Sequence, residues 1–69
     1  MKTTIKVDGN VTDMMHLPCI IAAHKTPATG EIFYELQTGE KSGQKYAHCG
    51  DILHIDDAGF ELEKYSPYL

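Results

Sequence analysis

Hydrophobic and polar residues alternate along short stretches of this chain, and turn-forming residues separate the stretches. Residues 3–7 (TTIKV) and 60–65 (FELEKY) alternate with a period of two, which is typical of a strand with one face buried. Asp8-Gly9 ends the first stretch, and Ala58-Gly59 precedes the second. Glycine after a small or acidic residue is a common turn signal. The two ends of the chain therefore predict half-buried strands.

The central part of the chain predicts further strands. Residues 19–25 (CIIAAHK) indicate a largely buried strand, and residues 31–38 (EIFYELQT) give the strongest strand signal because they are rich in β-branched and aromatic residues. Residues 45–48 (KYAH) and 52–56 (ILHID) are shorter candidates. Residues 11–18 are ambiguous: Asp13 is able to cap one helical turn, but Pro18 prevents a long helix.

Five or six short strands with turns about every 8–12 residues are typical of an all-β sandwich or barrel. We therefore expect one antiparallel all-β domain over residues 1–69, with little or no helix. At this length a small SH3-like or OB-like barrel is favoured, because closing a sheet removes its exposed edges.

The charge of the chain limits the classes of binding partner that it suits. The chain carries ten acidic residues, six lysines and no arginine, for a net charge of −4. Scattered lysines without arginine argue against direct nucleic-acid binding, whereas an acidic face suits a basic protein partner. The longest apolar run, CIIAA, is far too short to span a membrane. Without a secretion signal we expect a cytoplasmic protein with free thiols.

Two Cys-x4-His pairs, Cys19 with His24 and Cys49 with His54, raise the question of a zinc site. Zinc needs its ligands within about 2.0–2.3 Å. In a strand, residues five apart are separated by about 16–17 Å and point to opposite faces. The spacing therefore favours packing roles for these residues, with no metal and no cofactor. A site built from one residue of each pair across strands stays open.

Catalytic arrangements are also poorly supported. Cys49 beside His48 is the best nucleophile candidate, but adjacent strand residues point apart and no helix N-terminus is expected to stabilise a thiolate. Ser42 and Ser66 lie outside any nucleophile elbow. No glycine-rich phosphate-binding motif occurs. We therefore expect a protein that is not an enzyme.

The C-terminal third concentrates acidic residues. If residues 51–56 pair with residues 60–65, the resulting hairpin carries a negative field that steers it toward basic surfaces. Tyrosine is common in protein interfaces because its ring is apolar and its hydroxyl is polar. The predicted partner-binding residues are Asp51, Asp56, Asp57, Glu61, Glu63, Tyr46 and Tyr65.

These features predict a non-catalytic, acidic protein-binding module. One concrete form is a stand-alone inhibitor of the phage or mobile-element type that occupies a basic, nucleic-acid-handling surface of another protein. Two alternatives remain. One is an assembly subunit that oligomerises through strand edges such as residues 31–38. The other is an oligomeric barrel that binds a small ligand between protomers.

Overall fold

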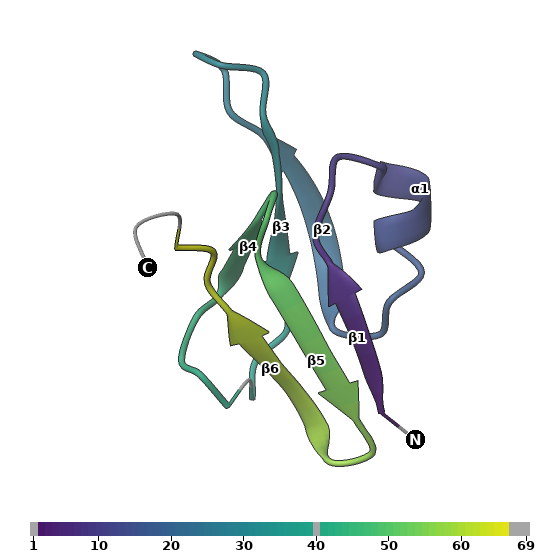
Figure 1. The fold of residues 1–69 in the computed structure, drawn as a ribbon. Coiled ribbons are helices and arrows are strands. Elements are labelled where there is room, and N and C mark those ends of the chain that lie inside the picture. Colours follow the sequence, from purple (N-terminus) through teal and green to yellow (C-terminus); the bar gives the residue numbers. More distant parts are fainter. Residues whose placement is uncertain (1, 40, 67–69) are drawn as a thin grey trace.

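The computed structural model describes residues 2–39 and 41–66. They form two three-stranded antiparallel sheets, ordered β1-β5-β6 and β2-β3-β4 (Figure 1). The elements are β1 (Thr3–Lys6), α1 (Val11–Met14), β2 (Ile20–Lys25), β3 (Ile32–Leu36), β4 (Tyr46–His48), β5 (Ile52–Asp56) and β6 (Gly59–Glu63). The all-β prediction is confirmed. The six strands remain two separate sheets, so the described residues do not close a barrel.

Each sheet turns one face toward a shared core. In the β1-β5-β6 sheet, Leu53 pairs with Leu62 and both are buried. In the β2-β3-β4 sheet, Tyr34 pairs with Ala47 and neither is exposed. These residues belong to one hydrophobic cluster. The alternation predicted for residues 60–65 is confirmed for residues 60–63, because Phe60 and Leu62 are buried while Glu61 and Glu63 are exposed; β6 ends at Glu63.

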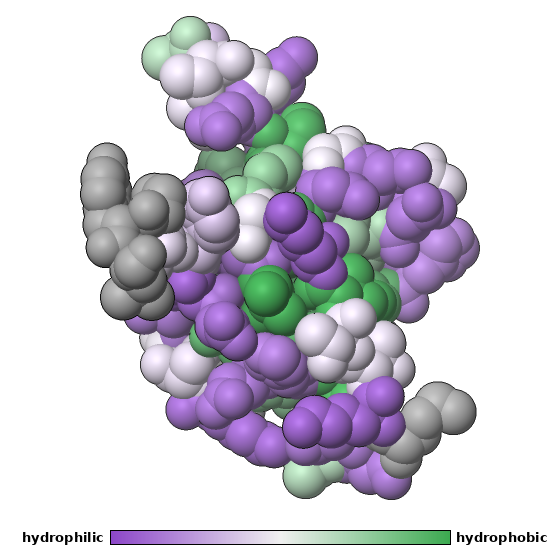
Figure 2. Space-filling view, viewed as in Figure 1, coloured by the Kyte–Doolittle hydropathy of each residue, from purple (hydrophilic) through white to green (hydrophobic). Residues whose placement is uncertain are grey.

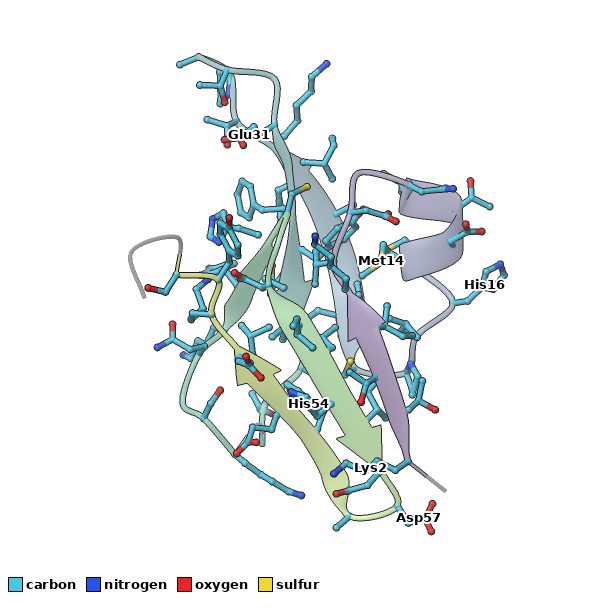
Figure 3. All side chains as sticks on the ribbon, viewed as in Figure 1. Lys2, Met14, His16, Glu31, His54 and Asp57 are labelled. Atoms are coloured by element: carbon cyan, nitrogen blue, oxygen red, sulfur yellow. The ribbon has the colours of Figure 1, made fainter. Side chains whose placement is uncertain are left out.

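A single helical turn links β1 to β2. The side chain of Asn10 accepts a hydrogen bond from the backbone N–H of Asp13 at 3.3 Å, and its amide donates to the Asp13 carboxylate at 2.8 Å. Asn10 is therefore the N-cap, and the prediction that Asp13 caps the turn is wrong. Met14 points from α1 into the core (Figure 3). Within the described chain, no helix is long and apolar enough to cross a membrane.

Strand β2 differs from its prediction as a largely buried strand. Only Ile20 is buried there, whereas Ile21 is 53% exposed. The cause is twofold: β2 lies at the edge of its sheet, and its pairing with β3 shifts register between Ile20 and Ala22. A register irregularity of this kind bends an edge strand and redirects its side chains.

Strand β3 is the central strand of its sheet, with β2 on one side and β4 on the other. Residues 31–38 therefore do not offer a free strand edge, and the prediction that this segment mediates assembly through its edge is wrong. The strong β-branched and aromatic signal of this segment reflects pairing on both sides.

Burial of Tyr34 gives a test of the fold. Its hydroxyl donates a hydrogen bond of 2.9 Å to the backbone carbonyl of Asp8, joining the middle of β3 to the turn after β1. Replacing Tyr34 with Phe is expected to lower the free energy of unfolding by about 1–2 kcal/mol, because the carbonyl loses its partner. Tyr46→Phe is the matched control. Tyr46 is 46% exposed, so this substitution should change the free energy of unfolding by no more than about 0.5 kcal/mol. Urea denaturation measures the free energy of unfolding of both variants. Equal losses would contradict a stabilising role for the hydrogen bond between Tyr34 and Asp8.

Candidate functional site

The predicted acidic hairpin exists. β5 and β6 pair from Ile52 opposite Glu63 to Asp56 opposite Gly59. Its carboxylates at Asp57, Glu61 and Glu63 are exposed. In the view onto this sheet, hydrophilic residues surround a hydrophobic area near the centre (Figure 2).

Lysines from other segments reduce the negative charge of this face. Lys41 pairs with Asp56 at 3.1 Å, and hydrogen bonding to the Lys41 ammonium is the main cause that lowers the pKa of Asp56. Lys6 of β1 lies opposite Ile52 of β5, so its side chain shares the outer face of the sheet with the glutamates. Lys2 lies at the same end of the sheet as Asp57 (Figure 3). The fold therefore places lysines among the carboxylates that are concentrated in the C-terminal third of the sequence.

Asp51 does not belong to the exposed acidic group. It is 3% exposed. One carboxylate oxygen accepts hydrogen bonds from the Lys64 ammonium at 2.7 Å and the His48 backbone N–H at 2.9 Å. The other accepts from the Tyr65 N–H at 2.9 Å. Burial alone would raise the pKa of Asp51, but these hydrogen bonds and the charge of Lys64 together lower it. Asp51 is a structural residue in this fold.

His54 occupies the centre of the outer face of the β1-β5-β6 sheet. Its Nε2 lies 3.0 Å from a Glu63 carboxylate oxygen, and its Nδ1 lies 3.4 Å from the Thr4 hydroxyl. This order of hydroxyl, imidazole and carboxylate is the one that activates nucleophiles in hydrolases. Here the Glu63 side chain is 62% exposed. Water therefore competes for each contact, and the arrangement lacks the burial that orients a catalytic base.

The cysteines and histidines are widely distributed. Cys19 is buried in the core, and burial raises the pKa of its thiol. His24, five residues later, stacks on Phe33 on the outer face of its sheet. Cys19 precedes β2 and a register shift follows Ile20, so the regular strand that the spacing argument assumed does not extend from Cys19 to His24. The Cys49 thiol is exposed and donates to the Ile32 carbonyl at 3.5 Å, so only Cys19 has the core packing role that the spacing predicts. Across residues 2–39 and 41–66, no three His, Cys, Asp or Glu side chains group as metal ligands.

The outer face of the β2-β3-β4 sheet carries an aromatic patch, formed by His24, Phe33, Tyr46 and His48. Phe33 stacks between the two histidines, with ring centroids 5.3 Å apart on each side and interplanar angles of 25° and 18°. Tyr46 meets Phe33 edge-on at 5.9 Å and 73°. Cross-strand pairing explains this grouping, since Phe33 lies opposite His24 on one side and His48 on the other.

A shallow hollow of about 310 Å³ opens on this patch, lined by His24, Phe33, Glu35 and Tyr46. The Glu35 carboxylate lies 3.0 Å from His24 Nε2. Both side chains are partly accessible, at 37% and 42%. The hollow therefore combines aromatic rings with a carboxylate that solvent can reach.

Sequence reasoning identified only part of this surface. Tyr46 was a predicted binding residue and lies in the patch, whereas Tyr65 packs over Gly50. His24, Phe33 and His48 were missed as a group because their contacts depend on strand register. The alternation of Phe33 and Glu35 with buried Tyr34 and Leu36 is the signal that places both residues outward. No protein-family model, curated protein or solved structure matches this chain.

The buried carboxylate predicts a pH-dependent stability. Because the pKa of Asp51 is lowered in the folded protein, its contribution is present above about pH 4 and is lost as pH falls through the folded-state pKa. Asp51→Asn is expected to lower the free energy of unfolding by about 2–4 kcal/mol at pH 7. This deficit should shrink below about pH 4.

Denaturant unfolding at several pH values measures this difference. Glu61→Gln is the control, because Glu61 is an exposed carboxylate on the outer face, and its effect should stay within about 0.5 kcal/mol. A deficit for Asp51→Asn that is constant from pH 7 to pH 3 would contradict the role of ionised Asp51.

Proposed function

We propose that this chain is a non-catalytic protein-binding module that holds a partner protein against the aromatic patch. The observation that carries this proposal is the cluster of four rings on the outer face of the β2-β3-β4 sheet, in which Phe33 contacts each of the other three. Aromatic residues are enriched at the centres of protein interfaces, and their mutual stacking fixes the rings before a partner arrives. Binding to such a patch costs less side-chain entropy than binding to mobile side chains.

A basic partner fits the charge of the chain. The net charge is −4, and the Glu35 carboxylate lies in the hollow of the patch. Opposite charges accelerate encounter and discriminate against acidic competitors. A narrower form of the proposal is an inhibitor that covers a basic, nucleic-acid-handling surface, of the kind that phages and mobile elements produce. Such an inhibitor needs no catalytic group of its own.

The proposal predicts that partner binding depends on the patch. In capture from host lysate at moderate salt, the double variant Phe33→Thr/Tyr46→Thr should recover at least about tenfold less of a stoichiometric partner, since a central aromatic often contributes 2 kcal/mol or more. Threonine suits exposed strand positions. Ile52→Thr is the matched control, because Ile52 is a partly exposed residue on the other sheet. Undiminished capture by the double variant would overturn the proposal.

The acidic hairpin is the second candidate surface. The observation in its favour is that Asp57, Glu61 and Glu63 are all exposed on one hairpin. If this surface binds the partner, the triple variant Asp57→Lys/Glu61→Lys/Glu63→Lys should lose capture while the patch variant keeps it. If the patch binds the partner, the triple variant should retain capture, with a changed dependence on salt because the charges of the rim affect mainly the association rate.

Assembly through strand edges remains the alternative from a different class. The available edges in the β2-β3-β4 sheet are β2 and β4, and β2 exposes Ile21. Recovery of the bait alone, as a defined oligomer in light scattering, would favour this alternative over partner binding.

A further inference from the structure

We infer that the hollow of the aromatic patch accepts the guanidinium group of one arginine side chain of the partner protein. This inference rests on the proposed function, because it names the chemical group that the patch recognises. It depends on three properties of the hollow: an accessible aromatic ring, a carboxylate without a lysine partner among the described residues, and the position of this carboxylate directly opposite Tyr46 across the strands.

The rings supply the first property. Phe33 and Tyr46 both line the hollow and meet at 73°. The two rings are in edge-to-face contact, and Phe33 also stacks against His24 and His48. A cation is therefore expected over the Tyr46 ring. The face of an aromatic ring is electronegative, so it attracts a cation placed over it. Tyr46 is 46% exposed, which leaves its ring open to such a group.

Glu35 supplies the second property. Two other carboxylates already have a lysine partner: Asp51 pairs with Lys64, and Asp56 pairs with Lys41. In the described part of the chain, Glu35 has no lysine within ion-pair distance, and its recorded partner is the His24 imidazole. The contact with His24 uses one carboxylate oxygen, Oε1, and the Glu35 side chain remains 37% exposed. An incoming cation can therefore reach a carboxylate that has no lysine partner among the described residues.

The third property distinguishes arginine from other groups. Guanidinium is planar, so it stacks on a ring while its N–H groups donate to a carboxylate at its edge. An ammonium group is compact and more strongly hydrated, which makes this combination less favourable. A neutral planar group can stack but gains nothing from Glu35. The order of preference expected for the hollow is therefore arginine, then lysine, then a neutral analogue of arginine.

The test is an NMR titration of the intact chain with N-acetyl-arginine amide, with ionic strength held constant by NaCl. The ring resonances of Phe33 and Tyr46 should shift in a saturable way, and the side-chain protons of the probe should move upfield. N-acetyl-citrulline amide, which has the same shape without the charge, should bind at least about threefold more weakly, as expected for loss of an exposed cation–π contact. Equal binding of both probes would overturn the inference.

Three variants locate the site. Glu35→Gln and Tyr46→Leu should each weaken arginine binding by about two- to fivefold. Glu61→Gln is the matched control for Glu35→Gln, because it removes an exposed strand carboxylate from the other sheet and should leave binding unchanged. The proposed site would be contradicted if the arginine probe shifted resonances of β5 and β6, and if Glu61→Gln weakened binding while Glu35→Gln did not.

The outcome separates this inference from the proposed function. If the arginine probe fails but partner capture still requires Phe33 and Tyr46, the patch binds a partner through another group and the inference is wrong. If the probe binds but capture does not depend on the patch, the proposed function is wrong while the cation preference of the hollow stands.

Discussion

The buried carboxylate of Asp51 is the interaction on which the rest of this small fold depends. It lies between the end of β4 and the start of β5, where the chain crosses from one sheet to the other. Through the His48 N–H it fixes the β2-β3-β4 sheet, and through Lys64 and the Tyr65 N–H it fixes the segment that follows β6. The neighbouring Gly50 has a φ of +99°, and a Cβ there would lie 3.3 Å from the Tyr65 ring. The crossing between the two sheets therefore requires both Gly50 and Asp51.

The same interaction positions the aromatic patch. Lys64 lies 3.3 Å from His48 Nδ1 as well as 2.7 Å from Asp51. A lysine ammonium can only donate, so His48 accepts at Nδ1, and its ring is held where it stacks on Phe33. The outer surface of one sheet is thus tied to a charge pair beside the core. Disturbing Asp51 affects both stability and the orientation of one end of the patch.

The fold was largely predictable from sequence because its main signals are local. Alternation located β1 and β6, and turn residues located the β5–β6 connection. The errors arose where tertiary context decides the outcome. Ile21 looked buried, but the register shift in an edge strand exposes it. Asp51 looked like one acidic residue among several, and only the crossing of the chain brings three donors to it. Cross-strand register assembled the aromatic patch in the same way.

Charged residues are distributed differently on the two sheets, and this difference leaves Glu35 without a lysine partner among the described residues. On the β1-β5-β6 sheet, the acidic residues share their outer face with lysines from β1 and from the loop at Lys41. On the β2-β3-β4 sheet, Glu35 lies beside aromatic rings and a histidine. The Glu35 side chain is 37% exposed and the Asp56 side chain 40%, so the two carboxylates differ in their neighbours and not in their exposure to water. A few charges in an aromatic setting can therefore matter more for recognition than a larger number on a mixed surface.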